Sequence, residues 1–123
     1  MKINGIHHVS MKCNPTEFEK AKEFYLNVLN LKVYKEWDSG IMIETPNGII
    51  EIFHNGENLP LGTIRHFAFS VSNLDLIVDE LKNKGYKFFV EPKDINLNGL
   101  KAKIAFFFGP LGEEIELFCE YEN

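Results

Sequence analysis

Two histidines and two glutamates stand at matching places in the two halves of the chain, and these residue types can bind a metal. His8 and His66 are each third in similar segments, IHHVSM and IRHFAF, which lie 58 residues apart. Glu51 and Glu116 are each second in the segments IEIF and IELF. Imidazole nitrogens and carboxylate oxygens together suit divalent first-row transition metals. The four residues are therefore candidate metal ligands.

The first histidine segment has the alternation of a β-strand, so its side chains divide between two faces. Val9 and Met11 are expected to pack against the helix that follows, with His8, Ser10 and Lys12 on the opposite face. The same alternation directs the other three candidate ligands away from the helices of their own halves. All four candidates thus share one kind of face.

Glutamate is unusual in the interior of a strand, and a buried carboxylate without a partner is strongly destabilising. A divalent cation would offset the charges of Glu51 and Glu116, and neutral His8 and His66 would complete a set of four ligands. An octahedral ion held in this way keeps two positions for water or substrate oxygens, as metal catalysis requires. Glu114 shares the face of Glu116 and is the rival ligand, but we expect it nearer to solvent because it begins its strand.

Each of these residues also has a simpler interpretation. A single strand histidine is usually a structural or surface residue, and a single strand glutamate usually faces water. The occurrence of four such residues at repeat-related positions favours the metal site. The mixed ligands suit nickel, cobalt or zinc, and also iron or manganese, so the sequence does not identify the metal.

The two halves of the chain share one order of elements, which is strand, helix and three strands. The first helix is predicted to begin after Asn14 and to end at Asn30, and the second to run from Ser72 or Asn73 to Gly85. Besides the two histidine segments, the predicted strands are 32–36, 41–45, 49–54, 86–90, 103–108 and 114–119. We therefore predict a single domain over residues 1–123, with one βαβββ module over about 1–55 and a second over about 63–121.

The composition is typical of an ordinary globular protein and excludes several classes of function. The 123 residues carry 13 Lys and Arg against 18 Asp and Glu, a net charge of −5, and Arg65 is the single arginine. A nucleic-acid backbone would be repelled, because the cations are few and scattered. No apolar run approaches about 20 residues, so neither a membrane span nor a signal peptide is expected. Cys13 and Cys119 lack C-x-x-C spacing, which favours a reducing compartment and predicts a cytoplasmic protein.

The chain resembles the vicinal oxygen chelate superfamily, which includes glyoxalases, bleomycin-resistance proteins and dioxygenases. The resemblance covers almost the whole chain and is carried by the two histidine segments, the two glutamate segments, the helix residues 21–31 and the PLG at 110–112. It implies an α+β fold in which two βαβββ modules form a half-open mixed barrel around one metal ion. It also implies a homodimer, and leaves open whether the site lies in one chain or is shared between two.

Within this superfamily the ligands are most similar to those of glyoxalase I, which uses His, Glu, His and Glu in this order. Ring-cleaving dioxygenases and fosfomycin-modifying enzymes generally lack the carboxylate at Glu51, and methylmalonyl-CoA epimerases usually carry glutamine there. The resemblance implies a lyase that detoxifies methylglyoxal by converting its hemithioacetal with a thiol into a lactoyl thioester. In that chemistry the metal stabilises an enediolate, Glu116 is the base and Glu51 assists it. Lys12 is the implied substrate-binding cation.

Two other functions remain open from the sequence. With one arginine the chain cannot make all the usual glutathione contacts, so the thiol need not be glutathione. The chain could instead be another metal enzyme of the superfamily, namely an epimerase, a thiol transferase or a dioxygenase. It could also be a metal-free binding protein of the bleomycin-resistance kind, although those proteins typically lack these ligands.

Overall fold

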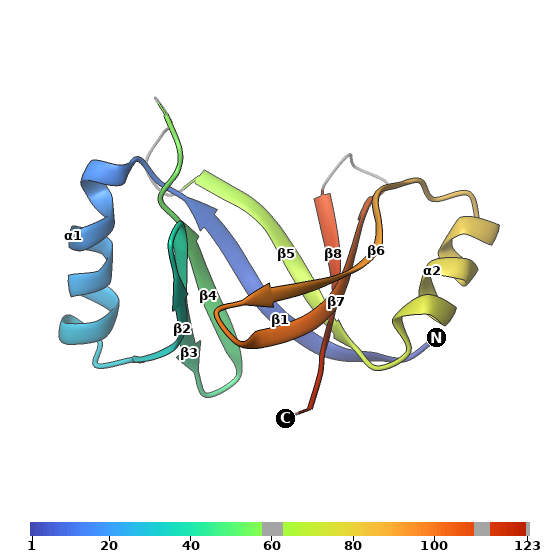
Figure 1. The fold of residues 1–123 in the computed structure, drawn as a ribbon, viewed down its shortest axis with the longest axis horizontal. Coiled ribbons are helices and arrows are strands. Elements are labelled where there is room, and N and C mark those ends of the chain that lie inside the picture. The colour runs from blue at the N-terminus through green and yellow to red at the C-terminus, as the bar shows by residue number, and fades with distance from the viewer. Residues whose placement is uncertain (58–62, 110–113, 123) are drawn as a thin grey trace. The chain divides into compact units, whose positions relative to one another are not determined.

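The computed structural model describes residues 1–57, 63–109 and 114–122, and its elements repeat the order strand, helix, three strands (Figure 1). The backbone divides into two compact units, one of His8–Arg65 and one of Met1–His7 with His66–Asn123. The first strand, β1 (Ile3–Lys12), contributes residues to both units. The predicted α+β fold of two βαβββ modules is therefore confirmed.

The unit His8–Arg65 contains four strands in the order β2-β3-β4-β1. These are β2 (Lys32–Trp37), β3 (Gly40–Thr45), β4 (Gly48–Phe53) and the second part of β1. β1 and β4 run parallel, whereas β3 is antiparallel to both of its neighbours. The parallel pairing of β1 with β4 matters most for function, because these strands carry His8 and Glu51.

The helical segment of this unit covers one face of its strands. It begins with a 3₁₀ turn (Pro15–Glu17), continues as α1 (Phe18–Lys22) and ends as a π-helix (Glu23–Val28). Asn14 and Glu17 form a capping box at its start, and Asn30, with a φ of 57°, ends it as predicted. The apolar side chains between this segment and the strands form a core of Cys13, Phe18, Ile41, Ile43 and Ile52.

The other unit has the strand order β1-β5-β8-β7-β6. Its elements are β5 (Thr63–Val71), α2 (Leu74–Asn83), β6 (Phe88–Leu97), β7 (Leu100–Phe108) and β8 (Glu114–Glu120). β5 and β8 run parallel, in the same relation as β1 and β4. The apolar stripe of α2 packs on these strands in a core of Val71, Leu74, Ile77, Val78, Leu81, Ala105, Phe107, Ile115 and Leu117.

The hairpin of β6 and β7 is longer than predicted. Residues 91–97 continue β6 beyond the predicted end at Val90, and β7 begins at Leu100. Asn98 and Gly99 join the strands with φ values of 52° and 95°, as in a two-residue hairpin turn. Pro92 is tolerated because β6 is an edge strand, and the pairing with β7 shifts register there.

One predicted core residue is not in the core. Val9 was expected to pack beside Met11 against the first helix, but its side chain is 39% exposed, whereas Met11 does contact the core. The alternation of β1 therefore correctly groups His8 and Ser10 on one face, where both are fully buried. It does not predict that Val9, on the opposite face, is left exposed.

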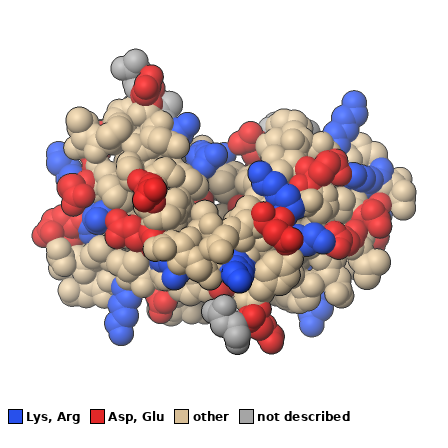
Figure 2. Space-filling view, in the orientation of Figure 1, with Lys and Arg blue, Asp and Glu red and all other residues tan. Residues whose placement is uncertain are grey.

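Charge is mixed over the surface that Figure 2 shows, where acidic and basic side chains are interspersed. Such a surface has no extended positive patch that would attract a polyanion. In the described ranges, no helix has the length and the apolar character that crossing a membrane demands.

Candidate metal centre

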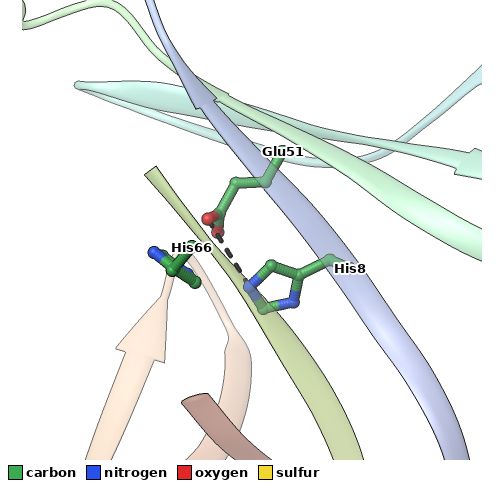
Figure 3. Close-up of side chains that lie close together, drawn as sticks. All are labelled: His8, Glu51 and His66. Carbon is green, nitrogen blue, oxygen red and sulfur yellow. Dashed lines mark ion pairs between the residues drawn. The ribbon is translucent and has the colours of Figure 1, made fainter. Parts of the chain in front are cut away.

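The first pair of candidate ligands lies in the unit His8–Arg65. His8 is carried by β1 and Glu51 by its parallel neighbour β4, where Glu51 stands opposite Ser10 in the strand register. Nε2 of His8 lies 3.6 Å from Oε1 of Glu51, and Figure 3 shows the carboxylate directed toward the imidazole. Their side chains are 0% and 4% exposed. The fold therefore buries a carboxylate and an imidazole together.

The second pair lies in the other unit and has the same construction. His66 is carried by β5 and Glu116 by its parallel neighbour β8, where Glu116 stands opposite Ala68. Nε2 of His66 lies 3.0 Å from Oε1 of Glu116, and each side chain is 5% exposed. The ring of Phe106 meets that of His66 edge to face, with 5.0 Å between the ring centroids, and so packs against the imidazole.

Both pairs follow one rule of position. In each unit the glutamate is paired with a residue of the neighbouring parallel strand, Ser10 for Glu51 and Ala68 for Glu116. The histidine lies two residues before that paired residue on the same strand. Since side chains two apart on a strand share a face, this register directs the histidine and the glutamate to the same side. The prediction that the four residues occupy equivalent faces follows from this rule.

The chemistry of the donors suits a divalent ion. His8, Glu51 and His66 are buried side chains of a kind and grouping that could hold a metal. Two carboxylates carry two negative charges and imidazoles bind metals when neutral, so a divalent cation would balance the charge of the full set. That Glu116 is the fourth ligand remains a prediction.

Two further residues were singled out from the sequence. Glu114, the rival ligand, is exposed at the start of β8, as expected from its position. Lys12 is half-buried and helps to line a cavity of about 400 Å³ together with residues of the helical segment such as Phe24 and Tyr25. Its assignment as a substrate-binding cation stays a prediction.

The other two histidines have structural roles. Nε2 of His7 lies 2.9 Å from Oε2 of Glu120, and its ring stacks on Phe118 with the centroids 4.1 Å apart. The ring of His54 lies 4.2 Å from that of Phe18 in the core beneath the helical segment. These contacts separate the structural histidines from the two that are paired with buried glutamates.

The two cysteines lie on the helix sides of their units. Burial raises the pKa of the Cys13 thiol, with a further contribution from the negative charge of Glu17. Burial also raises the pKa of the Cys119 thiol. Both are free cysteines, and a raised pKa keeps them as neutral thiols near pH 7.

Ser10 is a buried polar residue beside the His8–Glu51 pair, and no role was assigned to it from the sequence. It follows His8 by two residues on the same face, opposes Glu51, and is 0% exposed. Its position beside His8 in the alternating strand was a signal that could have identified it.

Comparison with known proteins places these pairs in context. Residues 5–117 match the pattern of the Glyoxalase/Bleomycin resistance protein/Dioxygenase superfamily. A protein described as uncharacterized, YwkD of Bacillus subtilis (strain 168), is 32% identical over 132 aligned residues, which cover 96% of this chain and 98% of that protein.

Solved structures of similar fold include proteins of several activities. A hypothetical protein, BH1468 from Bacillus halodurans C-125, is similar with a TM-score of 0.77 and 21% identity, over 96% of this chain and 95% of that chain. Methylmalonyl-CoA epimerase from Mycobacterium tuberculosis has a TM-score of 0.78 and 18% identity, over 98% of this chain and 90% of the other. The Mn(II)-bound glyoxalase from Novosphingobium aromaticivorans has a TM-score of 0.76 and 18% identity, over 96% of this chain and 39% of that longer one.

Proposed function

Because the chain belongs to the Glyoxalase/Bleomycin resistance protein/Dioxygenase superfamily, we propose that it is a metal-dependent enzyme of the glyoxalase I type. Its substrate would be the hemithioacetal of methylglyoxal and a low-molecular-weight thiol, and its product a lactoyl thioester. The observation that carries this proposal is the presence of two buried histidine–glutamate pairs built on the same strand register.

The proposed ligands of the metal are His8, Glu51, His66 and Glu116. Support comes from the burial of all four side chains, since a buried carboxylate is stable only when its charge is balanced. Further support comes from the remaining histidines, which pack on Phe118 and Phe18. Among the described residues, His8, Glu51 and His66 form the group that could hold a metal, and the proposal adds Glu116 to it. Nickel, cobalt and zinc suit these donors, and so do iron and manganese.

The proposed reaction moves a proton between two neighbouring carbon atoms of the substrate. A bound divalent metal would supply Lewis acidity that stabilises negative charge on the substrate oxygens. Glu116 would take the proton from the carbon beside the carbonyl and return it to the next carbon, and Glu51 would assist on the other face. His8 and His66 would stay fixed. Burial of both carboxylates keeps bulk water from competing for the proton.

The nature of the thiol is a separate part of the proposal. Arg65, the single arginine, stacks over the ring of Phe53, with its guanidinium carbon 4.4 Å from the ring centroid. A guanidinium engaged in this way is a poor candidate for clamping a flexible tripeptide carboxylate. Lys12 is then the proposed cation for an acidic group of the thiol, and thiols other than glutathione belong in the assay. The proposed active form is a homodimer.

A second candidate is an epimerase that acts on an acyl-CoA. It is supported by the likeness in fold to methylmalonyl-CoA epimerases, one of which is solved in complex with methylmalonyl-CoA. The chemistry would also use a base next to a carbonyl, so the same glutamates could serve it. Glu51 favours the glyoxalase I reaction, because the epimerases usually carry glutamine at that position.

The test begins with elemental analysis of protein purified without chelators or a metal-affinity column. We expect about one divalent metal ion per chain. The metal-loaded protein is then assayed with methylglyoxal and a panel of thiols, following formation of the thioester. A parallel assay follows deuterium incorporation from D₂O into methylmalonyl-CoA.

The outcomes separate the candidates. Thioester formation that is lost on chelation and restored by metal supports the glyoxalase I type. Deuterium incorporation without thioester formation would replace it with the epimerase. Protein that neither contains nor takes up a divalent metal would refute both and favour a metal-free binding protein.

A further inference from the structure

Ser10 places a buried hydroxyl group beside the proposed metal ligands His8 and Glu51. The residue is 0% exposed, and among the described residues Oγ has no hydrogen-bond partner. A buried hydroxyl without a partner loses its hydrogen bonds to water and gains none in return. In most proteins such a group is satisfied, so its partner here is a molecule outside the protein, either a buried water or a bound ligand.

Ser10 is a neighbour of the proposed metal ligands His8 and Glu51. Ser10 stands directly opposite Glu51 on the neighbouring parallel strand, and it follows His8 by two residues on the same face. His8, Glu51 and Ser10 are buried to the same degree, at 0%, 3% and 0% exposed. Ser10 therefore lies on the same strand face as the His8–Glu51 pair and is its neighbour in the strand register.

The second unit shows that the hydroxyl is not needed for packing at this position. Ala68 occupies the equivalent place, because it opposes Glu116 and follows His66 by two residues. Ala68 is 0% exposed, so a methyl group alone is compatible with the same register between parallel strands. The two pairs are built alike, and the hydroxyl distinguishes one from the other.

We propose that Ser10 Oγ donates a hydrogen bond to an oxygen atom of the bound substrate, and so makes the site prefer oxygen-rich ligands on the His8–Glu51 side. This inference rests on the proposed function, because it assumes that the substrate binds at the metal. The hydroxyl is the donor and a carbonyl, enediolate or hydroxamate oxygen is the acceptor. Ser10 is thus a substrate-binding residue that is distinct from the four proposed ligands.

The test uses the full chain loaded with Co²⁺, whose visible spectrum reports metal binding and ligand binding separately. The probe is acetohydroxamate, a small anion with two oxygen donors. In S10A we expect Co²⁺ affinity within about twofold of wild type and acetohydroxamate affinity lower by about five- to tenfold, the worth of one hydrogen bond.

The melting temperature of the metal-free protein gives an independent readout. S10A should melt at the same temperature as wild type or higher, because the variant removes a buried hydroxyl that has no protein partner. A melting temperature several degrees lower would identify Ser10 as a structural residue and overturn the proposal.

The outcomes also separate this inference from the proposed function. Wild-type protein that binds no Co²⁺ would refute the proposed function and the inference with it. Intact Co²⁺ binding with equal acetohydroxamate affinity in wild type and S10A would overturn only the role of Ser10. Weaker Co²⁺ binding in S10A would make Ser10 a support of the metal ligands instead, which also contradicts the proposal.

Discussion

Glu114 and Glu116 project from the same face of β8, yet Glu114 is exposed and Glu116 is 4% exposed. Glu116 approaches Nε2 of His66 to 3.0 Å. The two residues are therefore a matched pair of carboxylates on one strand, of which one is buried beside His66 and the other faces solvent.

Glu116→Gln should lower turnover of the substrate by at least about 100-fold, because an amide cannot accept the proton. The fold should persist, since glutamine has nearly the same volume, and circular dichroism and melting temperature check this. Glu114→Gln is the control and should keep activity within about twofold. Equal activity in the two variants would remove Glu116 from the mechanism.

Replacement of either paired histidine should reduce metal content. His8→Ala and His66→Ala each remove one proposed nitrogen ligand, and we expect the affinity for Zn²⁺ to fall by at least about 100-fold. Titration with a competing chromophoric chelator measures this affinity. His54→Phe is the control, because it keeps an aromatic ring against Phe18 and should leave metal affinity unchanged.

The prediction for the paired histidines is contradicted if only one of the two variants, His8→Ala or His66→Ala, loses metal affinity. Loss in His8→Ala alone would mean that His66 and Glu116 are a structural ion pair, and the four-ligand set would be wrong. Loss in His54→Phe would mean that the metal binds on the helix side of the unit.

The internal repeat was sufficient to predict that the four candidate ligands occupy equivalent strand positions. The equivalent positions of His8 and His66, and of Glu51 and Glu116, follow from two short similar segments, and strand alternation then assigns their faces. The structure explains why this works, since the same parallel register recurs in both units.

Other features were not accessible from alternation alone. Val9 has the residue type and spacing of a core residue, but it is 39% exposed. Whether a strand face is covered depends on how the elements pack, which alternation does not show. The extended hairpin of β6 was missed because polar and charged residues such as Lys93 and Asp94 do not look like a strand, although Asn98-Gly99 is a strong hairpin signal. That Ser10 Oγ has no hydrogen-bond partner among the described residues can be seen only from atomic positions.

Metal removal should destabilise the folded protein. A ligand that binds only the native state adds about 2.7 kcal/mol to the free energy of unfolding at 100 times its dissociation constant. Excess EDTA should therefore lower the melting temperature by several degrees, and a stoichiometric divalent metal should restore it. Differential scanning calorimetry makes the measurement. In the variant that lacks both His8 and His66, EDTA should have no effect.

Because the pKa of the Cys13 thiol is raised in the folded protein, the free energy of unfolding should fall at alkaline pH. Its pKa is higher in the folded state than in the unfolded state, so the folded state holds the thiol proton more tightly. The stabilisation is complete below the unfolded pKa of about 8.5 and is lost as pH rises through the folded pKa. Urea titrations from pH 8 to pH 10 should show the free energy of unfolding falling, with a smaller fall in Cys13→Ala. An equal fall in both proteins would assign the effect to other groups.

Gly40 packs so closely against β4, the strand that carries Glu51, that a side chain at this position should destabilise the protein. A Cβ atom at Gly40 would lie 2.8 Å from the carbonyl oxygen of Ile52 and 2.9 Å from Cζ2 of Trp37. The carbonyl belongs to the strand backbone and cannot move aside cheaply, so Gly40→Ala should destabilise the protein by about 1–3 kcal/mol. Glu44→Ala, at an exposed position of the same strand, should change stability by less than about 0.5 kcal/mol. Because Ile52 follows Glu51 directly, a shift of this backbone should also weaken metal affinity in Gly40→Ala but not in Glu44→Ala. Equal metal affinity in the two variants would show that β4 holds Glu51 independently of its packing on Gly40.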